Sequence, residues 1–201
     1  MPISDLSRRG ALVGLFGAAM LALPSGAQAL SESQARDLIN RVMEEVHGII
    51  NSGQSESRMI ARFERLFGDY ADVPAIARSA LGPPARSASA SQLSAFSTAF
   101  QGYMARKYGS QFRRFIGARV QVEGARPVQR YFEVISTMNL RGQSPFEVRW
   151  HVSDRSGSPL FFNLIIEGVN LLATERQEIG TMLERRGGDI AALITDLRAA
   201  G

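Results

Sequence analysis

Residues 160–172 read LFFNLIIEGVNLL, and this stretch is too apolar for a β-strand with one face in water. Such a strand alternates apolar and polar side chains, because successive side chains point to opposite faces of the sheet. Here apolar residues occupy both parities from Leu160 to Ile166, interrupted only by Asn163. Either protein covers both faces of this strand, or one face lines a cavity that an apolar ligand fills.

Three other short runs rich in β-branched and aromatic residues precede this stretch, at residues 119–124, 130–140 and 146–154. The segments RGQSP and DRSGSP separate the last three strands, and their Gly and Pro residues are typical of turns. The pattern predicts an antiparallel meander of about four strands. The third strand is expected to have an apolar face with Phe146, Val148 and Trp150, and a polar face with Glu147, Arg149 and His151.

Helical patterns, with apolar residues three and four apart, flank the strands on both sides. They predict helices over residues 31–53, 56–67, 72–82 and 91–115, and again over 171–186 and from 189 onward. Ser31 with Gln34, and Ser89 with Gln92, have the spacing of capping boxes. The order predicts an α+β fold in one domain, residues 30–201, with N-terminal helices, a twisted antiparallel sheet and C-terminal helices.

Residues 1–29 have the pattern of a secretory signal peptide. Arg8 and Arg9 precede an apolar run over residues 10–23, and Ala27-Gln28-Ala29 forms an A-x-A cleavage site. A run of this length is shorter than the ~20 residues of a membrane-spanning helix, which disfavours an uncleaved anchor. The stretch SRRGALVG resembles a twin-arginine signal, with Ala11 where Phe is usual. We expect a mature chain that begins at Leu30 and works outside the cytoplasm.

The sequence lacks the common catalytic and metal-binding motifs. It contains no cysteine, and its two histidines, His47 and His151, stand alone, so neither a metal site nor a cofactor is expected. His151 with Asp154 and Asn163 is the nearest grouping to a general base, and surface polar residues beside a turn are the favoured interpretation. The net charge of +4 is spread along the chain, which argues against a nucleic-acid partner.

The last strands and the aromatic helix over 91–115 carry more apolar residues than a small sheet needs to cover itself. This surplus has two interpretations. One is an ordinary packed core, and the other is a cavity that holds an acyl chain. The pattern alone leaves both open.

Two groups of motifs resemble the MlaC (toluene-tolerance) family of periplasmic phospholipid carriers. The first is DVPAIARSALG at 72–82, followed at 87–112 by a helix that carries Gln92, Phe96 and Phe100 at the family's spacing. The second is the segment at 163–198, with a strand, Glu-Gly-Val and closing helices. Together with the sheet, the likeness covers residues 31–198. Asn163 and Asn170 stand where the family often has Asp and Ser.

The resemblance implies a monomeric, non-enzymatic shuttle with a phospholipid ligand, whose tails enter an apolar cavity between sheet and helices. It implies transfer between an outer-membrane lipoprotein–porin complex and an inner-membrane MCE/ABC transporter, which maintains the lipid asymmetry of the outer membrane. Val169→Glu is expected to give a folded protein without lipid. The residues expected to line the cavity are Phe100, Tyr103, Met104, Val134, Phe146, Val148, Trp150, Phe162, Leu164, Ile166 and Val169.

Three alternatives to this carrier stay open at the level of sequence. The first keeps the fold and changes the cargo to a hopanoid or another lipid. The second is a small exported enzyme that uses His151 and Asp154. The third is a structural or adaptor protein with a dry core.

Overall fold

The computed structural model describes residues 30–200, with the side chains of residues 112 and 113 left out. The predicted leader lies outside the described residues, so both the signal peptide and its twin-arginine character stay predictions. The helices are α1 (Glu32–Ile50), α2 (Glu56–Tyr70), α3 (Val73–Leu81), α4 (Ala90–Gly109), α5 (Leu171–Arg185) and α6 (Ile190–Ala199), with short 3₁₀ segments η1 (Pro83–Arg86) and η2 (Phe112–Phe115). The strands are β1 (Arg119–Val128), β2 (Tyr131–Asn139), β3 (Phe146–Ser153), β4 (Leu160–Ile166) and β5 (Val169–Asn170).

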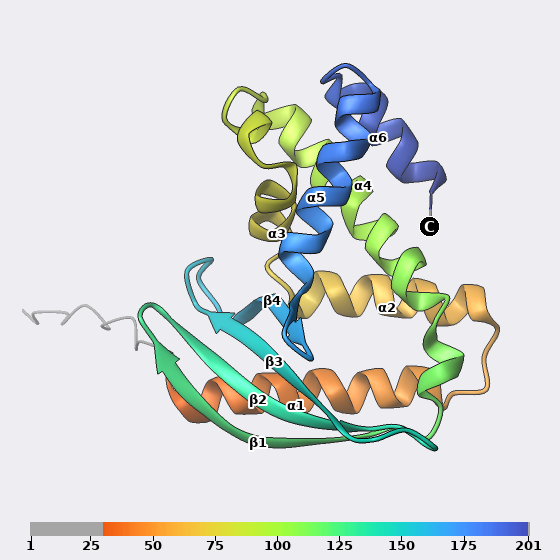
Figure 1. Cartoon of the computed structure of the whole chain (residues 1–201), viewed down its shortest axis with the longest axis vertical. Helices are drawn as coiled ribbons and strands as arrows, with labels where there is room; N and C mark the ends of the chain where they lie inside the picture. The colour runs from red at the N-terminus through yellow and green to blue at the C-terminus, as the bar shows by residue number, and fades with distance from the viewer. Residues whose placement is uncertain (1–29, 201) are drawn as a thin grey trace, which may run out of the picture.

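The predicted α+β fold is confirmed. The strands form one antiparallel sheet in the order β1-β2-β3-β4-β5, which is a meander with one very short additional strand. Figure 1 shows the sheet and α1 in one half of the molecule, the helices α3 to α6 in the other, and α2 between them. Helix α1 packs along β1, β2 and β3, whereas α3 and α5 contact β4.

Local sequence signals explain where the helices begin. Both predicted capping boxes are present, because the hydroxyls of Ser31 and Ser89 each accept a hydrogen bond from the backbone amide three residues on, and the backbone amide of each serine donates one to the glutamine side chain at that position. Asp72 caps α3, and Asp189 caps α6 through the amides of Ala191 and Ala192. Side chains with free acceptors thus satisfy amides that a helix start leaves unpaired.

The fourth helix is shorter than predicted, ending at Gly109 instead of continuing to residue 115. Gly109 lies against α2, where an added Cβ would come within 2.8 Å of the Ile60 side chain. Glycine permits this close approach but is a poor helix former. The chain then tightens into η2, which leads directly to the first strand.

The sequence suggested that the fourth strand leads directly into a helix, but a turn and the short strand β5 lie between them. Glu167 and Gly168 both adopt positive φ, 48° and 82°, as a two-residue hairpin turn requires. This turn folds Val169 and Asn170 back along β4 as β5. Asn170 then caps α5 through the amide of Ala173, at 3.1 Å.

A bulge in the fourth strand changes which of its side chains face the helices. His151 pairs with Asn163 and Val152 with Phe161, so Phe162 is left without a partner in β3. Two consecutive residues, Phe162 and Asn163, therefore lie on the same side of the sheet. Phe161, Leu164 and Ile166 lie on the other side, which faces the helices.

Within residues 30–200, no helix combines the length and the apolar character that crossing a membrane requires. In the same part of the chain, no three or more acidic or histidine side chains are grouped as metal ligands.

Candidate functional site: an apolar cavity between sheet and helices

A cavity of about 710 Å³ lies between the inner face of the sheet and the surrounding helices. Its size falls in the range of sites that hold small molecules, about 300–1,000 Å³. The sheet supplies one wall, and α1, α2 and the end of α4 with η2 supply the others. The sheet wall consists of Val120, Val122, Met138, Phe146, Val148, Trp150, Phe161, Leu164 and Ile166.

Six of the residues predicted to line a cavity lie in its walls. They are Met104, Phe146, Val148, Trp150, Leu164 and Ile166. Strand pairing brings them together: Trp150 lies opposite Leu164, and Val148 lies opposite Ile166. The alternation along β3 thus predicted its inner face, and the register with β4 extends that face across two strands.

Phe162 lies on the opposite face of the sheet, which corrects its predicted place. Its ring packs edge-on against Tyr131, at 5.5 Å between centroids, and lies 5.6 Å from the ring of His151. The cause is the bulge, which shifts the parity of β4 by one residue. Phe161 takes the inner position and packs edge-on against Trp150, with centroids 5.5 Å apart.

Val169 is also outside the cavity walls, with 55% of its surface exposed. The turn at Glu167 and Gly168 reverses the chain before this residue, so its side chain does not continue the inner face of β4. A charge at position 169 is therefore expected to be tolerated, contrary to the expectation from the sequence.

Three further predicted residues are buried away from the cavity walls. Phe100 stacks on Phe96 in the helical core, with ring centroids 5.9 Å apart. Tyr103 turns toward α5 and donates a hydrogen bond to Glu178. Val134 is fully buried in β2, opposite Trp150. An apolar stripe on a helix predicts burial, but not which of several buried surfaces the side chain meets.

The walls contributed by α1 and α2 were not among the predicted lining. They include Val42, Met43, Val46 and Ile50 from α1 and Phe63, Leu66 and Phe67 from α2. Their spacing of three and four residues was visible in the sequence and was interpreted as an ordinary inner face. The signal was present, but a stripe that packs on a core and one that packs on a cavity have the same period.

Trp150 occupies the cavity wall with its polar atom satisfied. Its Nε1 donates a 3.0 Å hydrogen bond to Ser136 Oγ, which in turn donates to the carbonyl oxygen of Val148 at 3.0 Å. Ser136 is fully buried, so this chain removes the cost of an unpaired hydroxyl beneath the indole. The indole ring is thereby fixed in one orientation against the cavity.

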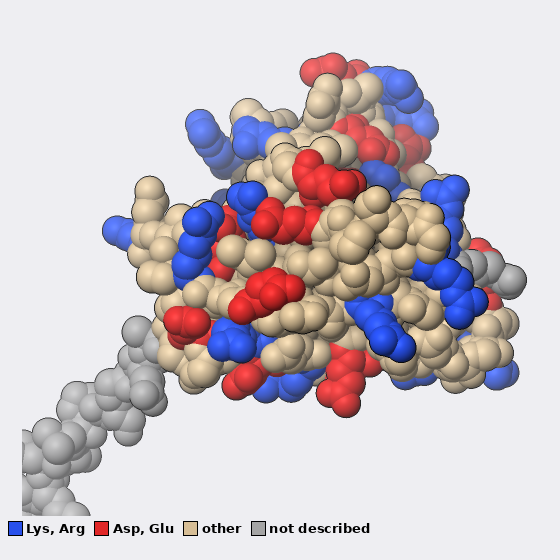
Figure 2. All heavy atoms as spheres, turned by 60° about the horizontal axis from the view of Figure 1, so that its bottom comes forward, with Lys and Arg blue, Asp and Glu red and all other residues tan. Residues whose placement is uncertain are grey.

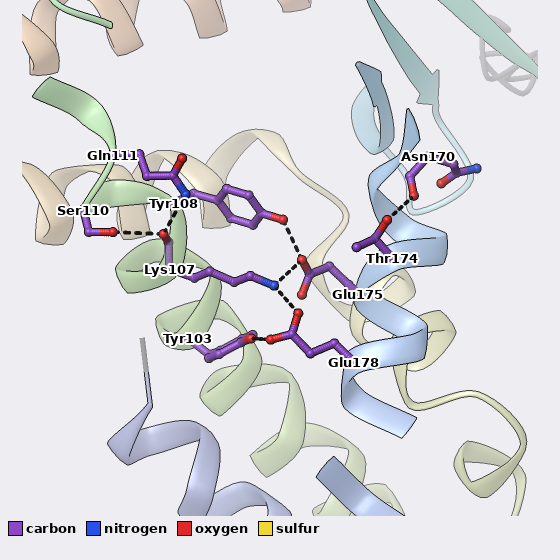
Figure 3. A network of polar contacts seen from close by, with 9 residues as sticks. All are labelled: Tyr103, Lys107, Tyr108, Ser110, Gln111, Asn170, Thr174, Glu175 and Glu178. Carbon is purple, nitrogen blue, oxygen red and sulfur yellow. Dashed lines mark hydrogen bonds and ion pairs between the residues drawn. The ribbon is translucent and has the colours of Figure 1, made fainter. Parts of the chain in front are cut away.

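A polar network between α4 and α5 holds Tyr108 at another wall (Figure 3). The Tyr108 hydroxyl donates a 2.6 Å hydrogen bond to Glu175 Oε1, and Lys107 Nζ donates to the same oxygen at 2.7 Å. Lys107 also reaches Glu178 Oε2 at 2.6 Å. One cation thus joins two carboxylates, of which Glu175 is only 1% exposed.

The network shifts the protonation of its members. Burial raises the pKa of Tyr103 to about 12, and its hydrogen bond to Glu178 acts in the same direction. Burial opposes the charge on Lys107, but hydrogen bonds from its ammonium to Glu175 and Glu178 outweigh this and raise its pKa. Burial would raise the pKa of Glu178, but Lys107 and Tyr103 donate to its carboxylate and lower it. At neutral pH the Tyr103 hydroxyl is therefore protonated, Lys107 is positively charged and Glu178 is negatively charged.

The outer face of the sheet carries a second polar group that the sequence placed in water. His151 is only 9% exposed, beneath the rings of Tyr131 and Phe162. Its Nε2 lies 3.5 Å from Glu133 Oε2, and Glu133 accepts a 2.8 Å hydrogen bond from Arg126 Nε. Burial lowers the pKa of His151, and the neighbouring Glu133 carboxylate offsets only part of that effect.

The grouping of His151 with Asp154 and Asn163, which the sequence offered as the nearest to a general base, is only partly present. Asp154 Oδ2 instead accepts a 3.0 Å hydrogen bond from the backbone nitrogen of Leu30. Asn163 does lie beside His151, with Nδ2 at 3.4 Å from Nδ1, and its Oδ1 accepts from the amide of Leu172. The histidine therefore forms part of a cluster that ties β4 to the start of α5.

Five polar residues border the cavity and are exposed to solvent, and they form its polar rim. Asn40, Glu44 and His47 of α1, Gln111 after α4, and Arg119 at the start of β1 are all exposed and all border the cavity. Basic and acidic side chains are both spread over the face of the molecule shown in Figure 2. The cavity thus has an apolar interior and a rim with both acidic and basic side chains.

Comparison with known proteins adds a family and a structural neighbour. The model of the MlaC protein family matches residues 40–199. A phospholipid-binding protein from Ralstonia solanacearum, solved in complex with a phospholipid, is similar in structure with a TM-score of 0.70. The match covers 82% of this chain and 94% of that chain, at 18% sequence identity. At this identity the likeness establishes a shared fold.

Proposed function

The chain belongs to the MlaC family, and from this premise we propose that it is a periplasmic phospholipid carrier. The observation that carries the proposal is the cavity of about 710 Å³ on the inner face of the sheet, whose interior is almost entirely apolar. A large apolar cavity is favourable when an apolar ligand fills it, and unfavourable when water does. The phospholipid bound by the Ralstonia solanacearum protein supports a ligand of this class.

The lipid tails occupy the space between Trp150, Leu164 and the helices, and the head group lies at the rim. Each CH₂ group moved from water into such a site contributes about 0.8 kcal/mol, so two acyl chains are held tightly. The exposed rim residues, among them His47 and Arg119, leave the charged head group in contact with water. A charged group in the apolar interior would lose its hydration without a partner.

A carrier that holds lipid this tightly needs partners that take the lipid from it. We assign this chain, as the family resemblance implies, to exchange between an outer-membrane lipoprotein–porin complex and an inner-membrane MCE/ABC transporter. The exchange maintains the lipid asymmetry of the outer membrane, and the chain acts as a monomer without catalysis. The signal-peptide pattern of residues 1–29 supports the location.

Native mass spectrometry of the protein purified from the periplasm tests this function, followed by analysis of the lipid that denaturation releases. The expected result is one phospholipid per chain. A stoichiometric hopanoid would keep the carrier and change the cargo. A ligand-free mass, with no uptake from phospholipid vesicles, would overturn the proposal.

A further inference from the structure

Among the residues whose side chains the structure describes, the Asp154 carboxylate has one hydrogen-bond partner, which is a backbone nitrogen. Its Oδ2 accepts a hydrogen bond from the nitrogen of Leu30 at 3.0 Å. Asp154 is half-buried at the turn between β3 and β4. A carboxylate held by one neutral amide is poorly compensated for the water it has lost.

A second carboxylate lies at the same turn and also lacks a cationic partner. Asp72, which is 5% exposed, accepts hydrogen bonds from the hydroxyl of Ser156 and from the amide of Ala75. Neither Asp72 nor Asp154 forms an ion pair with a Lys, Arg or His side chain of the described residues. Two carboxylates without a cationic side-chain partner thus border this turn, and one of them, Asp154, accepts a hydrogen bond from the nitrogen of Leu30.

Leu30 is itself firmly placed. Its side chain packs against the hydrophobic core, and the next residue, Ser31, is the cap of α1. Its nitrogen is also the atom that cleavage after the A-x-A sequence Ala27-Gln28-Ala29 would release. The nitrogen of Leu30 is thus both the atom that the predicted cleavage would release and the hydrogen-bond donor to Asp154.

We propose that Asp154 is the binding site for the mature N-terminus, and that removal of the leader completes an ion pair between the Leu30 ammonium and this carboxylate. Hydrolysis adds water across the Ala29–Leu30 peptide bond, so hydroxide goes to the carbonyl carbon of Ala29. The released amine of Leu30 takes protons to become an ammonium at neutral pH. The inference rests on the proposed export of the chain, and it assigns a structural role to the cut.

The ion pair matters for the cavity because it fixes the start of α1. This helix packs on the sheet and supplies Val42, Met43, Val46 and Ile50 to the cavity walls. In the uncleaved chain the same nitrogen is a neutral amide with a single hydrogen. Processing therefore strengthens the attachment of a cavity wall to the β3–β4 turn.

The test compares four proteins and one control variant, all made from the full precursor and purified from the periplasm. The first is the natural chain, and the second carries Asp154→Asn. The third has one Ser inserted between Ala29 and Leu30, so that the ammonium moves one residue, about 3.8 Å, from its position. The fourth combines both changes. Asp37→Asn, on the exposed side of α1, controls for the loss of one negative charge.

Intact mass and thermal unfolding at pH 7 give the result. We expect the natural chain to begin at Leu30 and Asp154→Asn to lower its Tm by about 2–4 °C, the scale for one partly buried interaction in a domain of this size. In the Ser-inserted chain the same substitution should lower Tm by less than about 1 °C. Asp37→Asn should leave Tm unchanged.

A mass that places the first residue elsewhere would overturn the inference, as would equal effects of Asp154→Asn in both backgrounds. The lipid content of each protein is measured in parallel. If Asp154→Asn lowers Tm only in the chain without the inserted Ser but no protein carries lipid, the carrier function alone is contradicted. If the proteins carry lipid but Asp154→Asn has the same effect in both backgrounds, the ion pair alone is contradicted.

Discussion

Tyr108 joins the cavity to the ion pairs between the helices: its ring lines the cavity, while its hydroxyl donates a 2.6 Å hydrogen bond to the buried carboxylate of Glu175. Because Lys107 donates to the same carboxylate oxygen, this part of the wall is held by charge as well as by packing. Charge-assisted hydrogen bonds of this kind are stronger than neutral ones and are directional. The position of the Tyr108 ring therefore depends on residues that do not touch the cavity.

The first prediction concerns the cation of this network. Lys107→Met should lower the free energy of unfolding by about 3 kcal/mol, because it leaves the Glu175 carboxylate buried without its counter-ion. Urea denaturation at pH 7 measures the change. The matched control is Arg186→Met, which breaks an ion pair with Asp196 at the surface and should have little effect. Equal effects of the two substitutions would show that the buried pair is not special.

The second prediction is an alkaline loss of stability. The pKa of Tyr103 is raised to about 12 in the folded protein, above the ordinary value of about 10. Between these values the unfolded chain binds fewer protons, so the free energy of unfolding falls as pH rises from 10 to 12, by up to about 1.4 kcal/mol per pH unit for this group. Tyr103→Phe should make this fall shallower in pH-dependent urea denaturation.

The third prediction separates the cavity wall from its surroundings. Leu164→Glu places a charge in the cavity and should give a folded protein that carries no lipid after purification. Val169→Glu, five residues on in the same hairpin, should retain lipid because Val169 is exposed. Circular dichroism verifies the fold, and extracted lipid is quantified by mass spectrometry. Retention by the Leu164 variant would show that the tails lie elsewhere.

The fourth prediction uses Trp150, the only tryptophan in the chain. Because its ring lines the cavity, phospholipids with brominated acyl chains should quench most of its fluorescence on binding, since bromine quenches only at close range. The unbrominated lipid of equal length is the control. Binding without quenching would place the acyl chains away from the inner face of β3.

The fifth prediction concerns the enzyme alternative. His151→Gln should leave lipid transfer between vesicles within about twofold of the natural rate, because His151 lies on the sheet face opposite the cavity. A steep loss of transfer at neutral pH in this variant would give the histidine a direct role.

Burial lowers the pKa of His151, so the folded state favours the neutral imidazole. The stability that the neutral histidine contributes is therefore lost as pH falls below about 6.5.

The sequence predicted those features that depend on neighbours along the chain. The capping boxes at Ser31 and Ser89 and the apolar face of the third strand are local features, and they are found as predicted, whereas His151 on the opposite face is buried. The inner face of β3 followed from its alternation, and with it the places of Val148 and Trp150. Such signals arise within a few residues, where propensity and pattern act directly.

The features that the sequence could not provide depend on pairing between distant segments. The bulge at Phe162 is visible only once β4 is aligned with β3, and it reverses the side on which that ring lies. Likewise, Glu167 followed by Gly168 is compatible with several turns, and only the observed hairpin moves Val169 out of the wall. The spacing of the apolar residues in α1 is the same whether they pack against a core or line a cavity.

Among residues 30–200, the edge strand β1 has one long side that no other strand pairs with. Unpaired strands of this kind invite a second molecule to add its own strand, which leads to aggregates. Here the register breaks between Val122 and Gly124, and Pro127 has no N–H to donate, so the strand is a poor template for further pairing. The edge of β1 can therefore stay exposed, at high protein concentration or in contact with other proteins, with little tendency to recruit a strand from a second molecule.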